Sequence, residues 1–181
     1  SSKSNINELL LKSLETISSD FIKNEDGFFF FFSGHGVYKD EPFLLFHEEL
    51  IKISEIYKLV NDKLKPKNQF FVFDACYSGE KIKSISEQAF INELYTQKLS
   101  SKSVNRTIIA ATRHDQTATE KKKYQNGTLT YYFIKALLQK DLYNENGFIT
   151  PTNIADYVRR EISLINNFEQ IPYTYSEDSG S

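Results

Sequence analysis

Two residues with complementary chemistry, His35 and Cys76, each follow a run of apolar residues in this 181-residue chain. A cysteine attacks a carbonyl carbon as its thiolate, and a nearby imidazole promotes or stabilises that form. An imidazole also holds or accepts a proton near neutral pH, which suits general acid–base work. Cys76 is the single cysteine of the chain. Taken alone, a cysteine after an apolar strand is more often a buried core residue than a nucleophile. The hypothesis of a Cys–His site therefore depends on the pairing of Cys76 with His35.

The elements that must position this pair are two predicted strands. Residues 28–32 are five consecutive phenylalanines between a turn at 24–27 and Ser-Gly-His-Gly at 33–36, which predicts a strand buried on both faces. Residues 70–73 form a second apolar strand that leads into Asp-Ala-Cys. Ligands bind beyond the carboxyl ends of parallel strands, so we expect a Cys–His site at one rim of the sheet. The glycines that flank His35 would let the backbone approach a substrate and offer N–H groups to an oxyanion.

The rest of the chain alternates apolar strands with helical periodicity, which predicts an α/β sandwich with a mostly parallel sheet. Ser54 is a plausible helix cap, and Thr150 followed by Pro151 is a good helix start. The polar tail, residues 173–181, is expected to be loosely held. Further strands are predicted at 43–46 and 107–111, and helices at 5–18, 53–60, 129–138 and 150–162.

Composition narrows the class of protein. The length fits one domain, 1–181, with a sizeable core. The 22 Lys and Arg residues face 24 Asp and Glu residues, so the net charge of −2 gives no electrostatic argument for nucleic-acid binding. No apolar run approaches the roughly 18 residues that a membrane span needs. A single cysteine allows neither an internal disulfide nor a C-x-x-C zinc site, which fits a reducing, cytoplasmic location.

The segments around His35 and Cys76 resemble, as a pair, those of the caspase-like cysteine peptidases (peptidase family C14, clan CD). The resemblance is closest to metacaspases and paracaspases, covers about residues 5–172, and implies a caspase-like three-layer α/β/α sandwich. The segments that carry it are Phe-Phe-Ser-Gly-His-Gly at 31–36, Phe-Val-Phe-Asp-Ala-Cys-Tyr-Ser-Gly at 71–79, Ile-Ala-Ala-Thr at 109–112, Asp-Gln-Thr-Ala at 115–118 and Gly-Thr-Leu-Thr-Tyr-Tyr at 127–132.

The resemblance implies a cysteine endopeptidase that hydrolyses protein or peptide substrates. Cys76 would be the nucleophile, and His35 would protonate the leaving amine and later activate water. The backbone N–H groups of Gly36 and Cys76 would form the oxyanion hole. Asp74 would lie in the S1 pocket and select Arg or Lys, which agrees with the preference of a partly buried carboxylate for a cationic partner. The alternative for Asp74 is a structural carboxylate that caps nearby amides.

The resemblance also implies an earlier central strand and helix, which nothing before residue 5 can supply. A missing central strand would leave ladder groups unpaired. We therefore expect it in a separate N-terminal chain or activator, in an N-terminal product that stays bound, or in a region outside this sequence. In the family, a second acidic residue helps to bind the basic side chain of the substrate, and it also lies in this earlier strand and helix.

The stretch after Cys76 bears on calcium and on self-cleavage. Many metacaspases are activated by calcium near this loop, but residues 80–83 read Glu-Lys-Ile-Lys, poor in the oxygen ligands that calcium needs. We therefore expect no metal, no calcium requirement and no other cofactor. The lysines of the loop at 80–105 have two interpretations: a solvated surface, or a self-cleavage site, because exposed loops tolerate nicking. Asp115 and Glu120 are candidates for a substrate groove.

Other functions remain open. A catalytically silent caspase-like scaffold would keep the fold without activity, and CHAT-type or separase-like peptidases share related His-Gly and Cys-x-x-Gly patterns. A cysteine phosphatase is excluded, because it needs an arginine six residues after its cysteine to hold phosphate, and position 82 is Ile. A small-molecule binding module on an α/β sheet is a further alternative, although the chain has no Gly-rich phosphate loop such as G-x-x-x-x-G-K.

Overall fold

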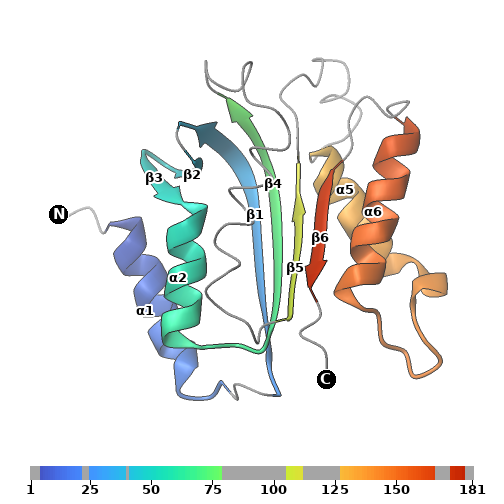
Figure 1. The fold of residues 1–181 in the computed structure, drawn as a ribbon, viewed down its shortest axis with the longest axis horizontal. Helices are drawn as coiled ribbons and strands as arrows, with labels where there is room; N and C mark the ends of the chain where they lie inside the picture. The colour runs from blue at the N-terminus through green and yellow to red at the C-terminus, as the bar shows by residue number, and fades with distance from the viewer. Residues whose placement is uncertain are drawn as a thin grey trace.

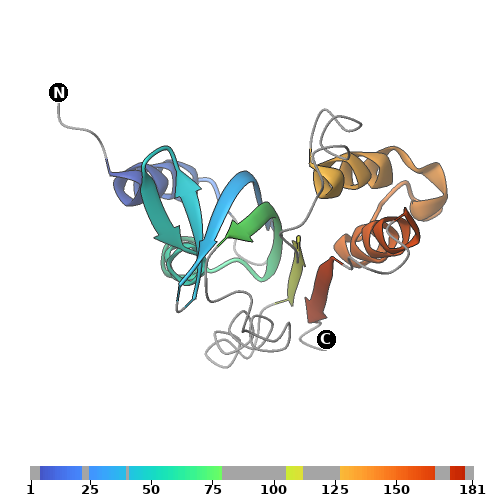
Figure 2. The same ribbon diagram turned by 90° about the horizontal axis from the view of Figure 1, so that it is seen from above.

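The described part of the chain is an α/β sandwich of three layers (Figures 1 and 2). The computed structural model describes residues 5–21, 25–39, 41–78, 105–111, 127–165 and 172–177. The helices in these ranges are α1 (Ile6–Ser18), α2 (Ile53–Lys63), α5 (Thr128–Leu138) and α6 (Pro151–Ile165), with a 3₁₀ turn, η3, at Lys140–Leu142. The strands are β1 (Gly27–Tyr38), β2 (Pro42–Phe46), β3 (Glu49–Lys52), β4 (Asn68–Ser78), β5 (Asn105–Ala110) and β6 (Tyr173–Glu177).

The sheet is mixed, in the order β3-β2-β1-β4-β5-β6. Among the described strands, β1, β4 and β5 run parallel to one another, while β2, β3 and β6 join as antiparallel neighbours. The expectation of a mostly parallel sheet is therefore wrong. The physical reason is that β2 and β3 are joined by a tight turn at His47, where φ is 57°, and a short turn can join only antiparallel strands. Residues 173–177 are likewise not loose, because they pair with β5 as β6.

One face of the sheet packs against α1 and α2. Phe28, Phe32, Phe71 and Phe73 belong to this core together with residues of both helices. The edge of the Tyr57 ring meets Phe71 with ring centres 4.7 Å apart. Alternation along β1 and β4 thus sends every second phenylalanine to the α1–α2 side, as the two-residue period of a strand requires.

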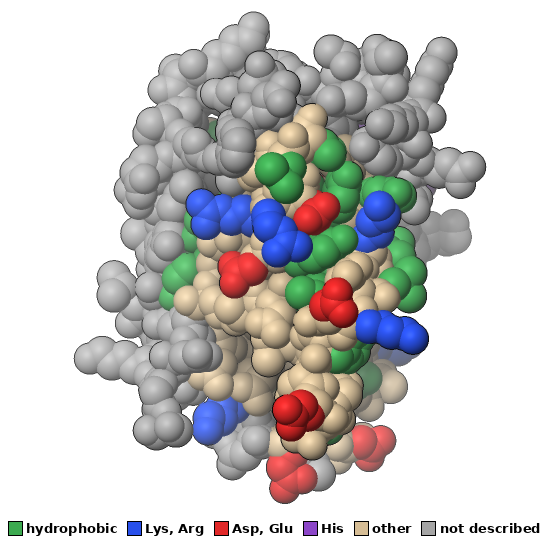
Figure 3. All heavy atoms as spheres, turned by 90° about the vertical axis from the view of Figure 1, so that its right-hand side faces the viewer, with side chains coloured by type: hydrophobic (Ala, Val, Ile, Leu, Met, Phe, Trp, Pro, Cys, Tyr) green, Lys and Arg blue, Asp and Glu red, His purple; other side chains and the backbone are tan. Residues whose placement is uncertain are grey.

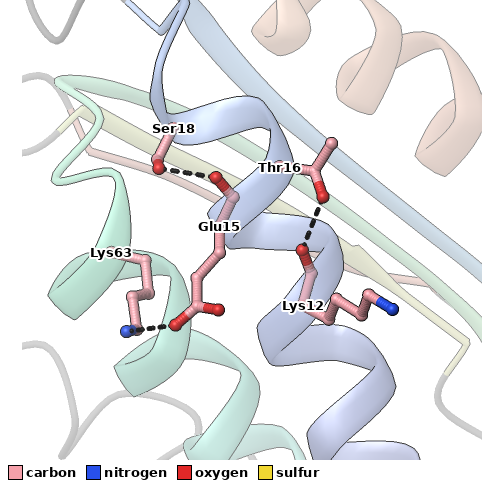
Figure 4. A network of polar contacts seen from close by, with 5 residues as sticks. All are labelled: Lys12, Glu15, Thr16, Ser18 and Lys63. Atoms are coloured by element: carbon pink, nitrogen blue, oxygen red, sulfur yellow. Dashed lines mark hydrogen bonds and ion pairs between the residues drawn. The ribbon is translucent and has the colours of Figure 1, made fainter.

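Polar contacts tie α1 to its neighbours. Asn5 accepts a hydrogen bond from the N–H of Asn7, and Glu49 accepts one from the N–H of Ile6 at 2.7 Å, so both caps satisfy amides of the first turn. An ion pair between Lys63 and Glu15, 2.8 Å apart, links α2 to α1 (Figure 4).

The start of α2 differs from the expectation. Lys52 is its N-cap residue and makes no side-chain cap bond. Ser54 lies inside the helix, and its hydroxyl donates to Glu41 at 2.8 Å instead of capping the helix. The cap predicted at Ser54 is therefore wrong, because β3 runs directly into α2 and moves the helix start to Ile53.

The other face of the sheet is only partly covered by α5 and α6. Val72 and Ile109 pack there against residues of both helices. On β1, however, Phe29 is 52% exposed and Phe31 is 37% exposed, so the predicted burial of this run on both faces is wrong. The reason is that α5 reaches β1 chiefly through Phe133, whose ring stacks on Phe29 at 5.9 Å.

Among the described strands, β1 has an edge that is only partly paired. It pairs with β4 over residues 27–37 but with β2 only over residues 35–38. In the described part of the chain, residues 27–34 therefore pair on one side alone. An open edge of this length beside exposed phenylalanines is the feature that natural sheets usually cover.

The outer surface of α6 and its surroundings carries basic and acidic side chains interspersed with small apolar areas (Figure 3). None of the described helices is long and apolar enough to cross a membrane.

Candidate active site

The backbone brings His35 and Cys76 together. The strands β1 and β4 are parallel neighbours, and His35 is the register partner of Cys76. Neighbouring strands lie about 4.8 Å apart, so the two α-carbons are adjacent at the carboxyl-terminal part of both strands. His35 is exposed. The two positions are thus adjacent in the backbone.

Burial of β4 fixes this arrangement. Phe71, Val72, Phe73 and Ala75 are all 0% exposed, and the strand runs between β1 and β5. Such a strand cannot shift its register without exposing its apolar side chains. The position of Cys76 relative to His35 is therefore set by the core below the site.

Gly36 lies within the sheet. Strand β1 continues past the glycine-flanked histidine to Tyr38, and Gly36 is buried between its register partners Leu44 on β2 and Tyr77 on β4. The segment Ser-Gly-His-Gly is thus strand, where the sequence suggested a strand end.

Asp74 contacts the amino terminus of α5. Its Oδ2 accepts a hydrogen bond of 3.1 Å from the backbone N–H of Thr130 and a second, short one from the Thr130 hydroxyl. The N-cap residue of α5, Gly127, has no side chain to cap the helix, and the first turn contains no acidic residue. The Asp74 carboxylate supplies the missing acceptor and lies at the positive end of the helix dipole. The structural capping role that the sequence left open for Asp74 is therefore present.

Gly127 is required by this contact. A β-carbon at this position would lie 2.2 Å from Asp74 Oδ2 and 2.8 Å from Oδ1. No side chain fits at that distance without moving the carboxylate. Asp74 itself is half-buried, with its carboxylate against the backbone of the helix start.

Sequence reasoning missed Thr130 and Gly127 as part of the site. The available signal was a helix start, Gly-Thr-Leu-Thr, that has a glycine where a capping side chain is usual. That pattern indicates that the acceptor comes from elsewhere in the chain. It does not identify Asp74, which is 56 residues away.

Several predicted features lie outside the described residues. These are residues 80–83 as a poor calcium loop, all but the last residue of the self-cleavage loop at 80–105, and the groove candidates Asp115 and Glu120. Within the described ranges, no group of three or more His, Cys, Asp and Glu side chains is placed to hold a metal ion.

Comparison with known proteins identifies the class. The family model described as the caspase domain matches residues 4–179, so the chain belongs to the caspase-domain family, most of whose members are cysteine peptidases. A crystal structure of a protein from Geobacter sulfurreducens has a similar fold, with a TM-score of 0.55 and 12% sequence identity over 96% of this chain and 74% of that one. None of the curated proteins matches the sequence.

Proposed function

We propose that this chain is a cysteine endopeptidase that cleaves after Arg or Lys, with Cys76 and His35 as its catalytic dyad. The observation that supports the dyad is the register pairing of His35 with Cys76 across two parallel strands. Membership of the caspase-domain family supports the reaction class.

The reaction would proceed in two steps. The Cys76 thiolate adds to the scissile carbonyl carbon, the C–N bond breaks, and His35 donates its proton to the leaving amine. His35 then takes a proton from water, which attacks the thioester and releases the acid and the thiolate. Backbone N–H groups of Gly36 and Cys76 are proposed to bind the oxyanion.

Asp74 is proposed to recognise the basic side chain of the substrate. It lies two residues before Cys76 on the same strand, and its carboxylate is half-buried. A carboxylate held partly out of water prefers a cationic partner, and an acidic substrate side chain at this place would be repelled.

The test is turnover of short fluorogenic peptides with Arg, Lys or Asp at the cleaved position, for the wild-type chain and Cys76→Ala, with and without calcium. Turnover after Arg or Lys that Cys76→Ala abolishes is the expected result, with no change on adding calcium. Turnover only after Asp would overturn the role of Asp74. No turnover would favour the scaffold alternative or an inactive precursor, and alkylation of Cys76 near neutral pH separates these two.

A CHAT-type or separase-like peptidase remains the alternative within the same reaction class.

Self-cleavage in the 80–105 loop is part of the metacaspase-like proposal. Mass spectrometry should then find wild-type chain cut after a lysine of this loop, while Cys76→Ala stays intact. A wild-type enzyme that cleaves added peptides but leaves its own loop whole would remove self-processing from the proposal.

We also propose that one further strand completes the sheet beside β1, supplied by a separate N-terminal chain or activator, or by a segment outside the present sequence. The open edge at residues 27–34 and the exposed rings of Phe29 and Phe31 support this. In the isolated chain, the alternate amides of residues 28–34 that face away from β4 should exchange their hydrogens quickly. Slow exchange at all of these amides would contradict the proposal, because the edge would already be covered.

A further inference from the structure

We infer that Thr130 is a positioning residue of the basic-residue pocket, which holds Asp74 by one oxygen so that the other meets the substrate cation. This inference rests on the proposed function, because it assigns the pocket to Asp74. Thr130 comes from the first turn of α5, far from Cys76 in the sequence, and acts only through Asp74.

The two carboxylate oxygens of Asp74 differ in the number of hydrogen bonds that they accept. Both donors of Thr130, its N–H and its hydroxyl, go to Asp74 Oδ2. A carboxylate oxygen has two lone-pair sites, so Oδ2 is fully used. Among the described residues, Oδ1 accepts no hydrogen bond, and its two sites are left for a cationic partner.

The helix that carries Thr130 is packed into the core. The helix α5 buries Leu129, Phe133 and Ala136 at 2%, 6% and 0% exposure, in the same cluster as Val72 of β4. Thr130 is itself buried, at 9% exposure. The donor and acceptor are thus anchored to two elements that share one core, and this pre-orients the carboxylate before a substrate arrives.

Gly127 also restricts the orientation of the Asp74 carboxylate. Because its backbone lies against the carboxylate, the side chain of Asp74 cannot turn toward the helix start without a clash. A methyl group at position 127 would push both carboxylate oxygens away from their present place. Gly127→Ala is therefore a second, independent way to disturb the orientation while leaving Asp74 and Thr130 unchanged.

The test compares Thr130→Val, which is isosteric but lacks the hydroxyl, with Thr130→Ser, which keeps it. We expect Thr130→Val to raise KM for an Arg peptide about tenfold, the effect of losing one charge-assisted hydrogen bond. The substitution should raise KM and leave kcat unchanged, because the pocket binds the basic side chain of the substrate equally well before and during the chemical step. Thr130→Ser should restore the wild-type KM, and Gly127→Ala should behave like Thr130→Val.

Gly27→Ala is the matched control for Gly127→Ala, since a β-carbon at Gly27 would meet nothing within 4 Å. If the wild-type enzyme cleaves Arg peptides, and Thr130→Val and Gly127→Ala both keep the wild-type KM, the inference is wrong while the proposed function stands. A fall in kcat without a change in KM would also overturn it, because it would reveal only a loss of folded enzyme.

A readout without catalysis separates the inference from the proposed function. In a double-mutant cycle on urea unfolding, Asp74→Ala and Thr130→Val should lower the unfolding midpoint by less together than the sum of their separate effects. Additive effects would show that the two side chains are not coupled and would overturn the inference. If coupling is found but the wild-type chain cleaves no basic peptide, the proposed function fails and the pocket role of Thr130 fails with it.

Discussion

His35 and Cys76 are register partners on the parallel strands β1 and β4. The pairing depends on the whole length of the two strands, which are aligned from Gly27 opposite Asn68 to Val37 opposite Ser78. A slip of one residue would turn buried phenylalanines of β4 toward the opposite face. The core of the sheet thus sets the relation between the two proposed catalytic positions.

The first prediction concerns the reactivity of Cys76. A thiol beside an imidazole reacts faster with iodoacetamide near pH 7 than a free thiol does, because more of it is thiolate. His35→Ala should slow this alkylation at least several-fold and abolish peptide turnover. His47→Ala, in the exposed turn between β2 and β3, is the matched control and should change neither. Equal alkylation rates in wild type and His35→Ala would show that the two side chains do not interact.

A second prediction separates the two roles of Asp74. Asparagine keeps an acceptor for Thr130 and caps helices as well as aspartate does, whereas alanine cannot accept. Asp74→Ala should therefore lower the free energy of unfolding by about 1 kcal/mol, and Asp74→Asn by only a few tenths. Both variants should lose cleavage after Arg and Lys, because both lack the charge. Urea unfolding and peptide kinetics on the same samples provide the check.

If Asp74→Asn retained wild-type turnover after Arg, the carboxylate would serve the helix alone. The structural role would then stand without the pocket role.

A third prediction follows from the use of Oδ2 by Thr130. A bidentate contact is what favours arginine over lysine at a carboxylate, and it needs both oxygens. With one oxygen committed, the two substrates should differ in kcat/KM by less than about tenfold. Paired peptides that differ only in Arg or Lys at the cleaved position measure this ratio. A strong preference for Arg would indicate that Asp74 releases Thr130 when the substrate binds.

A fourth prediction compares two phenylalanines on neighbouring strands. Phe71 on β4 is 0% exposed, whereas Phe29 on β1 is 52% exposed. Phe71→Ala should cost about 3–5 kcal/mol of unfolding free energy, the usual loss for a buried phenylalanine. Phe29→Ala should cost clearly less, because half of its ring already meets water. Similar losses in urea unfolding would mean that Phe29 is covered in solution.

Much of this fold is predictable from the sequence, and the exceptions have physical causes. The apolar runs of β1, β4 and β5 and the periodicity of the four described helices indicate their elements, because a short continuous apolar run favours a strand and a 3.6-residue apolar period favours a helix. The short strand β3 and the polar strand β6 are recognisable only through their partners, β2 and β5. Exposure of Phe29 depends on how far α5 reaches across the sheet, which no local pattern records.

The candidate site divides in the same way. The adjacency of His35 and Cys76 in the backbone is predictable, because each follows an apolar run of the sequence and parallel neighbouring strands bring the ends of such runs to one side of the sheet. The hydrogen bonds from Thr130 to Asp74 are not predictable, since they join residues 56 positions apart through the packing of α5 on β4.

The last prediction concerns a buried phenol. Burial raises the pKa of Tyr57, and the nearby Arg106 guanidinium, 4.8 Å from the ring centre, offsets part of that rise. Below about pH 10 the phenol is neutral in both folded and unfolded chains, and the stability it confers is fully present. Above that pH the unfolded chain ionises first, so the free energy of unfolding should fall by up to about 1.4 kcal/mol per pH unit until the folded phenol ionises too. In Tyr57→Phe this contribution disappears. The substitution should be nearly neutral at pH 7, because the hydroxyl has no hydrogen-bond partner among the described residues. Urea unfolding of wild type and Tyr57→Phe from pH 7 to 11 measures the difference, and parallel curves over this range would show that Tyr57 ionises equally in both states.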